Sequence, residues 1–340
     1  MIKKYNPFFF FFTVGFFLLN PYVITAQKSR NLSIKDGLPS NSIRVIYKAV
    51  NGLLWIGTDA GLCSYDGNII KVYDENNGLP SNLVWSITED DQGHLWIGCY
   101  NGGICYYDGV SFKSYSKQDG LPSKRVRKLF FKDDLLFIST DSKLVIFDGN
   151  NFYFKKFMMQ VMSVVEVENS NYVISRALGT YKLTYDRDSL SNFKLDSCAW
   201  YGSLFGGISF QNGLLLFKDK KLLKLSKDSL ANCNGVENIK SNSITWDACV
   251  GNDSSVYLAQ WGVNVNNGGL FRINGTNIES LNEEFGLLSS QMISLYYDQL
   301  NNVLFVGTLD RGLYILFLNQ TFSYQSQIFN NKNKELVSNE

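Results

Sequence analysis

A short phrase that returns at a nearly constant spacing constrains this chain more than any other feature of its sequence. Gly37-Leu-Pro-Ser40 recurs as Gly78-Leu-Pro-Ser81 and as Gly120-Leu-Pro-Ser123, so the three glycines lie 41 and 42 residues apart. A period of about 40 to 45 residues, built from short strands, is typical of the four-stranded blades of a β-propeller. We therefore predict an all-β ring of antiparallel blades.

Each copy of the phrase is followed by the same two patterns. The first is a strand with a central aromatic residue, and the second is an aromatic-Asp-Gly turn. The strands are Trp55-Ile-Gly57, Trp96-Ile-Gly98 and the degenerate Phe137-Ile-Ser139, and the turns are Tyr65-Asp-Gly67, Tyr107-Asp-Gly109 and Phe147-Asp-Gly149. Because Trp55 and Trp96 recur at equivalent places, we expect them to fill the space between adjacent blades rather than to contact a ligand.

One unit taken in full contains four strands. Residues 81–88, 94–98, 104–107 and 111–115 are β-rich, and the polar segments between them are short turns. No part of the chain after the amino-terminal segment keeps a helical apolar period over three turns, so almost no helix is expected.

The number of units follows from the length of the chain. Residues 163–185, 203–226 and 243–281 keep the strand–turn–strand rhythm without the phrase, which returns in part at Gly286-Leu287 and Arg311-Gly-Leu313. Seven units of about 45 residues fill the chain after the amino-terminal segment. We therefore predict a single seven-bladed β-propeller. The segment Asn31–Ile34 precedes the first phrase where a fourth strand should lie, and we expect it to complete the last blade and close the ring.

The first 26 residues resemble an export signal. Lys3 and Lys4 give a basic start, residues 8–19 form an apolar run, and Ile24-Thr-Ala26 ends in small residues. A membrane-spanning helix needs about 20 apolar residues, although retention of the signal as an anchor stays open. We predict three parts, namely a signal (1–26), a propeller (27–325) and a polar tail (326–340), with the mature chain periplasmic or secreted.

Composition excludes several classes of function. Without Lys3 and Lys4 the chain has 30 basic and 31 acidic residues, and nothing after the signal is apolar enough to insert into a membrane, so neither nucleic acid nor a membrane is an expected partner. A single histidine, His94, limits chemistry that needs imidazole, which disfavours catalytic triads, Cys-His pairs and multi-histidine metal sites. No cofactor or metal is expected, and Cys63 and Cys105, at equivalent places in two repeats, are predicted to be reduced core residues.

Two charged segments are interpreted as ordinary surface. The acidic residues at 89–91 and 133–134 fall in equivalent hairpins and lack the alternating spacing of calcium loops. The run from Lys117 to Lys128 holds five basic residues, but Gly120-Leu-Pro bends the chain within it.

The string Asp36-Gly-Leu-Pro-Ser, Leu54-Trp-Ile-Gly-Thr58, Gly61-Leu62 and Tyr65-Asp-Gly67 closely resembles the two-component regulator propeller repeat. The resemblance is strong over residues 30–155, weak over 160–285 and partial over 286–318. It implies an exported sensor region like those of bacterial hybrid histidine kinases, which often detect oligosaccharides. Phosphotransfer is not implied, because the chain contains no kinase segment.

Function is expected where one blade departs from the others. In a propeller the loops between second and third strands, together with the loops joining successive blades, lie on one face around the central channel. The candidate ligand-binding residues on this face are Asp59, Tyr100, Asn101, Asp141, Arg176, Trp200, Tyr201, Trp261, Asn264, Asp310 and Arg311. The loop 260–268 is longer than its counterparts, and its tryptophan and asparagines suit a carbohydrate. Packing of Trp261 on a neighbouring blade is the alternative.

These observations favour a non-catalytic exported module that recognises a glycan or another polar ligand. Three alternatives remain open. The chain is a truncated or split periplasmic sensor portion of a two-component histidine kinase with a signalling partner protein, a protein–protein scaffold, or a lyase or hydrolase that uses the carboxylates of Asp59, Asp141 and Asp310.

Overall fold

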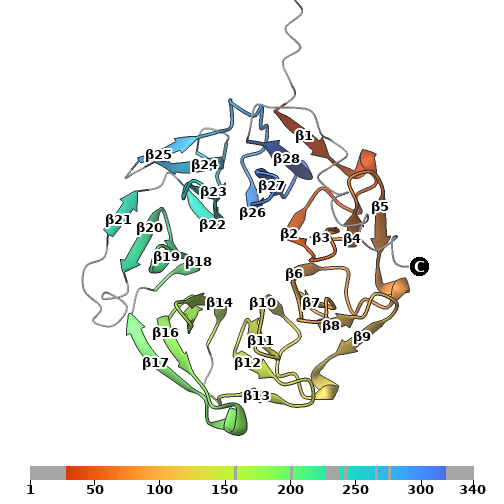
Figure 1. The fold of residues 1–340 in the computed structure, drawn as a ribbon, viewed down its shortest axis with the longest axis vertical. Coiled ribbons are helices and arrows are strands. Elements are labelled where there is room, and N and C mark those ends of the chain that lie inside the picture. Colours follow the sequence, from red (N-terminus) through yellow and green to blue (C-terminus); the bar gives the residue numbers. More distant parts are fainter. Residues whose placement is uncertain are drawn as a thin grey trace, which may run out of the picture.

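Seven four-stranded sheets surround a central axis (Figure 1), as the repeats predict. The computed structural model describes residues 28–156, 159–199, 202–226, 237–240, 243–264, 267–274 and 277–318. The predicted signal and the predicted tail therefore lie outside the described residues. Within the described ranges, no helix is both long enough and apolar enough to cross a bilayer.

The blades are numbered 1 to 7 in chain order, and each consists of consecutive antiparallel strands except at the closure of the ring. The innermost strands are β2 (Ile43–Lys48), β6 (Val84–Glu89), β10 (Val126–Lys132), β14 (Val161–Val167), β18 (Leu204–Phe210), β22 (Ile244–Val250) and β26 (Met292–Asp298). The second strands are β3 (Leu54–Thr58), β7 (Leu95–Cys99), β11 (Leu135–Thr140), β15 (Ser170–Ser175), β19 (Gly213–Lys218), β23 (Val256–Trp261) and β27 (Val303–Thr308).

The outer two strands complete each blade. The third strands are β4 (Gly61–Tyr65), β8 (Gly103–Tyr107), β12 (Leu144–Phe147), β16 (Gly179–Thr184), β20 (Lys221–Ser226), β24 (Gly269–Asn274) and β28 (Leu313–Phe317). The outermost strands are β5 (Ile70–Tyr73), β9 (Phe112–Tyr115), β13 (Phe152–Phe154), β17 (Lys194–Ala199), β21 (Glu237–Lys240), β25 (Asn277–Ser280) and β1 (Ser29–Leu32).

The first strand of the chain closes the ring. β1 pairs antiparallel with β28, in a register that runs from Ser29↔Leu316 to Leu32↔Leu313, so blade 7 is built from both ends of the propeller (Figure 1). This confirms the predicted closure but corrects its bounds by two residues. The strand ends at Leu32 because Ser33 and Asp36 cap each other reciprocally and begin a 3-10 helix, η1 (Ile34–Asp36).

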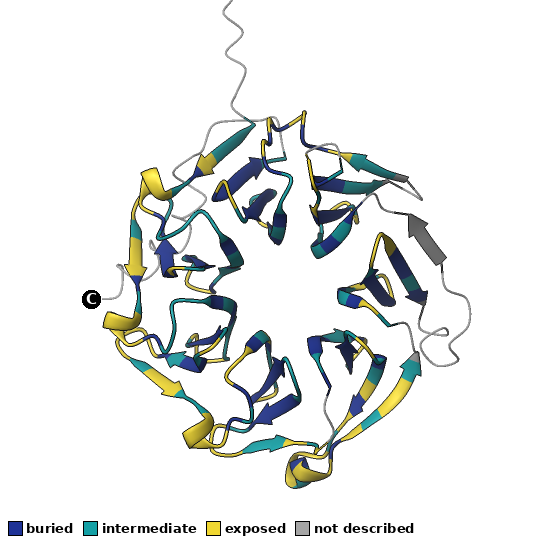
Figure 2. Ribbon diagram, turned by 180° about the vertical axis from the view of Figure 1, so that it is seen from behind, coloured by how far each residue is buried: buried dark blue, intermediate teal, exposed yellow. Residues whose placement is uncertain are grey.

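The Gly-Leu-Pro phrase is the end of a capped turn between blades. The helices η1, η2 (Glu75–Asn77) and η3 (Lys117–Asp119) each begin at a Ser or Asp cap and end at the glycine of the phrase. Gly37 has a φ of 105°, which favours glycine at this position. A fourth 3-10 helix, η4 (Arg187–Asn192), ends without glycine. Figure 2 shows that exposed residues gather on these helices and on the outermost strands.

The core lies between adjacent blades. Trp55 of blade 1 is 4% exposed, and its ring lies 5.5 Å from that of Tyr73 and 5.7 Å from that of Tyr107 in blade 2. Gly57 allows this close packing, because a Cβ atom there would lie 2.5 Å from a methyl carbon of Val45 and 2.6 Å from one of Val84. Trp55 and Trp96 are thus confirmed as packing residues.

The predicted core thiols are also confirmed. Cys63 and Cys105 are fully buried and free, and burial raises the pKa of Cys63 to about 12. The described residues therefore offer no reactive thiolate at these two positions.

Candidate functional site

A β-bulge occurs at the same place in the innermost strand of every blade. In each blade, one residue near the start of the innermost strand has no partner in the second strand. The register between the two strands shifts at that residue. All seven of these residues line the central cavity of the ring. We call them the bulge ring, which consists of Arg44, Trp85, Arg127, Met162, Phe205, Trp246 and Ile293.

The bulge ring surrounds a cavity of about 510 Å³. Trp261, the last residue of β23, and Leu309, which follows β27, also line this cavity. Tyr47 of β2 and Leu295 of β26 line it as well. A volume of this size falls within the range of about 300–1,000 Å³ that is common for small-molecule sites. The channel thus has room for a ligand the size of a small saccharide.

An ion pair crosses the channel one residue further along the innermost strands. Lys128 of blade 3 and Asp247 of blade 6 approach to 3.8 Å, although their strands β10 and β22 lie on different sides of the ring (Figure 1). Asp247 is held in place because its other oxygen accepts a hydrogen bond of 2.9 Å from the backbone of Leu295. The pair therefore bridges the channel beside the bulge ring.

Several polar atoms in the cavity wall have no hydrogen-bond partner among the described residues. They include the indole Nε1 of Trp246, the Nε of Arg127 and the hydroxyl of Ser163. A buried donor without a partner costs about 1–3 kcal/mol. A ligand that offers acceptor oxygens in the channel would recover part of that cost.

Aromatic and cationic side chains alternate over blades 1 to 3. The rings of Trp85 and Tyr100 are stacked with centroids 4.0 Å apart. The guanidinium of Arg44 lies 5.1 Å from the Trp85 ring, and that of Arg127 lies 5.9 Å from Trp85 and 5.7 Å from Tyr100. These separations allow cation–π attraction, which holds the arginines at the channel wall.

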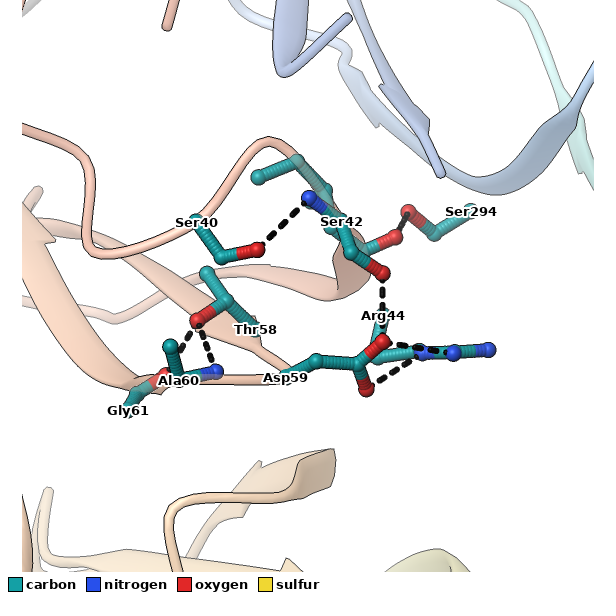
Figure 3. A network of polar contacts seen from close by, with 9 residues as sticks. Ser40, Ser42, Arg44, Thr58, Asp59, Ala60, Gly61 and Ser294 are labelled. Atoms are coloured by element: carbon teal, nitrogen blue, oxygen red, sulfur yellow. Dashed lines mark hydrogen bonds and ion pairs between the residues drawn. The ribbon is translucent and has the colours of Figure 1, made fainter. Parts of the chain in front are cut away.

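Asp59 fixes the orientation of Arg44 (Figure 3). Its two carboxylate oxygens accept hydrogen bonds of 2.7 Å and 2.6 Å from Arg44, and Ser42 donates a further one of 2.6 Å. Burial acts to raise the pKa of Asp59, but the hydrogen bonds from Arg44 and Ser42 outweigh it and hold the pKa below its usual value. Asp59 is therefore a positioning residue for the bulge ring.

This arrangement gives Asp59 a specific effect on acid stability. Folding lowers the pKa of Asp59, so its ionised carboxylate stabilises the folded protein. This contribution to the free energy of unfolding is complete above the pKa of the unfolded chain, about 3.9, and is lost as the pH falls through the pKa of the folded protein. The free energy of unfolding, measured by urea denaturation at pH 5.5 and at pH 3, should therefore fall less in Asp59→Asn than in the wild type. An equal fall in both proteins would contradict this role.

The structure brings some of the other predicted residues to the channel. Trp261 lines the cavity and remains 43% exposed, Tyr100 stacks on Trp85, and the guanidinium of Arg176 lies 4.9 Å from the Phe205 ring. The segment between β23 and β24, residues 262–268, is longer than residues 59–60 between β3 and β4, as the sequence predicts.

Trp261 is the only predicted residue within the described part of the chain that lines the cavity itself. Asp141 is held by Ser123 at 2.7 Å and by Arg125 at 3.4 Å. Asp310 accepts a hydrogen bond of 2.5 Å from Ser289 and lies 3.7 Å from Arg311. Asn101 and Asn264 are exposed loop residues. Trp200 and Tyr201 lie outside the described residues.

Sequence reasoning missed every residue of the bulge ring. Arg44, Trp85 and Arg127 each lie seven residues after the glycine of the phrase, where the side chain changes while its surroundings repeat. That variability was the available signal. Interpreting residues 117–128 as ordinary surface was wrong in part, because β10 begins at Val126 and carries Arg127 and Lys128 to the channel.

The fold and its channel define a seven-bladed propeller with a lined central cavity. Two of its segments, residues 37–60 and 78–101, match the family model of the two component regulator propeller. The chain thus carries repeats of this family in blades 1 and 2, which confirms the resemblance seen in the sequence. No sequence among the curated proteins matches the chain.

Solved structures share the fold. The extracellular domain of a hybrid two-component system from B. thetaiotaomicron has a TM-score of 0.69 and 17% identity, over 86% of this chain and 42% of that chain. Virginiamycin B lyase from Staphylococcus aureus has a TM-score of 0.63 and 12% identity, over 86% and 98%. PorZ, a surface component of the type-IX secretion system of Porphyromonas gingivalis, has a TM-score of 0.61 and 14% identity, over 86% and 38%. The chain therefore spans less than half of that extracellular domain.

Proposed function

We propose that this chain is a non-catalytic, exported recognition module of the sensor type, and that it binds a glycan or another polar ligand in the central channel. One observation carries the proposal. A single structural position, the bulge, presents five types of side chain from seven blades to one cavity, whereas the motif residues that repeat are used in packing. A repeated backbone with varied side chains suits recognition of an asymmetric ligand.

The chemistry of the cavity supports a polar ligand with apolar faces. Phe205 and Trp246 lie with ring centroids 5.6 Å apart and nearly perpendicular, so they present aromatic surface for the C–H faces of a sugar. Trp246 Nε1 and Ser163 Oγ add polar atoms for hydroxyl groups. Arginine, aromatic and hydroxyl groups thus converge on the same volume.

Sensing through a partner is the second part of the proposal. The likeness to the extracellular domain of a two-component system and the two matched repeats support a sensor in the periplasm or outside the cell. Because the chain spans 42% of that domain, a signalling partner, or a further part of a longer protein, would read out binding. A kinase in the neighbouring open reading frame would support a split sensor.

The contacts of the carboxylates offered for a lyase or hydrolase favour positioning roles. Asp59 and Asp141 are each held by a serine and an arginine, and Asp310 has the same two kinds of neighbour. The lowered pKa of Asp59 also opposes a role as a general acid near neutral pH. The fold shared with virginiamycin B lyase carries no residue assignment at 12% identity.

A ligand screen tests this function. The thermal midpoint of the protein should rise with at least one member of a panel of neutral and acidic oligosaccharides, because a ligand that binds only the folded state stabilises it. Trp246→Ala should weaken that binding by about tenfold or more, whereas Val110→Ala, in the exposed turn before β9, should not. Silence across the panel, or equal binding by Trp246→Ala, would contradict the assignment of the site. Binding of peptides instead would favour a scaffold.

A further inference from the structure

Blades 1 and 3 each place an arginine at the bulge position, but only the arginine of blade 1 has a counter-ion among the described residues. Arg44 and Arg127 are the bulge residues of β2 and β10. Arg44 is neutralised by Asp59, the residue that follows β3, through two hydrogen bonds of 2.6 and 2.7 Å. Arg44 is thus an arginine at the bulge position whose charge the protein itself neutralises.

Arg127 has no such counter-ion among the described residues. Asp141 follows β11 as Asp59 follows β3, but it is engaged by Ser123 at 2.7 Å and by Arg125 at 3.4 Å. Arg127 forms no ion pair with any described residue, and its Nε has no hydrogen-bond partner there. The guanidinium is held beside Trp85 and Tyr100 and faces the cavity.

Blade 4 adds a second positive charge. Arg176 follows β15, at the place where blades 1 and 3 have an aspartate. Within the described part of the chain it forms no ion pair, and its guanidinium lies 4.9 Å from the Phe205 ring. Burial and the neighbouring cations Arg176 and Arg125 lower the pKa of Arg127 against the opposing effects of Tyr100 and Asp141. The blades of Arg127 and Arg176, blades 3 and 4, are neighbours in the ring, because β10 packs against β14.

The charges on this side of the channel do not balance. Over blades 1 to 4 the cations at the bulge position and after the second strands are Arg44, Arg127 and Arg176, a fourth cation, Arg125, lies just before β10, and the anions are Asp59 and Asp141. Four positive and two negative charges leave a local excess of two. Arginine is well suited to bind a planar carboxylate through two parallel hydrogen bonds.

We infer that the ligand of this channel is an acidic oligosaccharide, in which a uronate carboxylate pairs with Arg127 and Arg176 while the sugar ring packs on the adjacent aromatic residues. The inference rests on the proposed function and narrows its ligand class. The carboxylate would supply to Arg127 the counter-ion that Asp59 supplies to Arg44. A free polycarboxylate offers the same charge without the sugar ring, and the experiment separates the two.

Isothermal titration with three probes tests this inference. The probes are trigalacturonate, the same trisaccharide with its carboxylates reduced to alcohols, and citrate. Trigalacturonate should bind more tightly than the reduced trisaccharide by about tenfold or more, and less tightly in 200 mM than in 20 mM NaCl. Arg127→Gln and Arg176→Gln should each weaken its binding by a similar factor. Arg187→Gln is the control, because Arg187 lies in η4 and pairs with the exposed Asp134.

Each contrary outcome has a distinct meaning. Equal binding of the two trisaccharides, or unchanged affinity in a folded Arg127→Gln variant, would overturn the acidic ligand. The proposed function would then still stand where Trp246→Ala weakens binding. Citrate that binds as tightly as trigalacturonate, and depends on Arg127, would overturn the saccharide. Failure of trigalacturonate while the reduced trisaccharide binds would overturn the inference alone. Failure of all three probes and of the wider panel would overturn the proposed function as well.

Discussion

Replacing Trp55 by alanine should lower the free energy of unfolding by about 3–5 kcal/mol, the usual cost of deleting a large buried aromatic side chain. The indole is 4% exposed and fills the space between blades 1 and 2, where it contacts the rings of Tyr73 and Tyr107. Its removal leaves a cavity that the rigid sheets on either side can only partly fill. Chemical denaturation followed by far-ultraviolet circular dichroism measures the loss.

The same substitution at Trp261 is the matched control. Trp261 is 43% exposed and lines the channel, so Trp261→Ala should change the free energy of unfolding by less than about 1 kcal/mol. Similar losses at the two positions would contradict the division of tryptophans into packing residues and channel residues. A loss only at Trp261 would reverse that division.

Removing the carboxylate of Asp298 should also destabilise the ring by about 3–5 kcal/mol, the range for breaking one partner out of a buried ion pair. Asp298 at the end of β26 forms an ion pair with Lys48 at the end of β2, and their side chains are only 4% and 12% exposed. Asp298 also accepts hydrogen bonds from the backbone of Leu300 and from the side chain of Asn301. It therefore stabilises both a hairpin turn and the junction between the last blade and the first.

A double-mutant cycle isolates the ion pair. The variant Asp298→Ala/Lys48→Met should lose less stability than the sum of the two single variants, because each single change leaves one charge in a buried site and the double change leaves none. Free energies from urea denaturation at one ionic strength provide the comparison. Additive losses would show that the pair does not couple blades 1 and 7.

The ring was predictable because its determinants are local and repeated. The period of the Gly-Leu-Pro phrase fixes the size of a blade, and the alternation of short strands with polar turns continues through blades 4 to 6, where the phrase is absent. The closing strand was predicted two residues too late. That error arose because the reciprocal cap between Ser33 and Asp36 ends the extended backbone, and its side-chain hydrogen bonds depend on geometry that the apolar pattern does not record.

The candidate site was predictable only in part, for a physical reason. Loop residues such as Tyr100, Arg176 and Trp261 could be placed from their positions after second strands, and they do lie at or beside the channel. For the bulge ring the sequence offered only the variable residue seven positions after the glycine of the phrase, because a bulge is a property of the register between two strands. It turns Arg44, Trp85 and Arg127 toward the channel at a position where plain alternation gives no such information.

A crystal structure of the protein with the tightest-binding saccharide of the titrations tests most directly whether the bulge ring is the recognition surface. We expect the ligand to occupy the cavity between Arg127 and Trp246, with a carboxylate within hydrogen-bond distance of Arg127 and a sugar ring against an aromatic side chain. A ligand seated on the outermost strands or on the hairpin turns of the opposite face, with no contact to any residue of the bulge ring, would contradict the proposal that this propeller recognises its ligand through the channel.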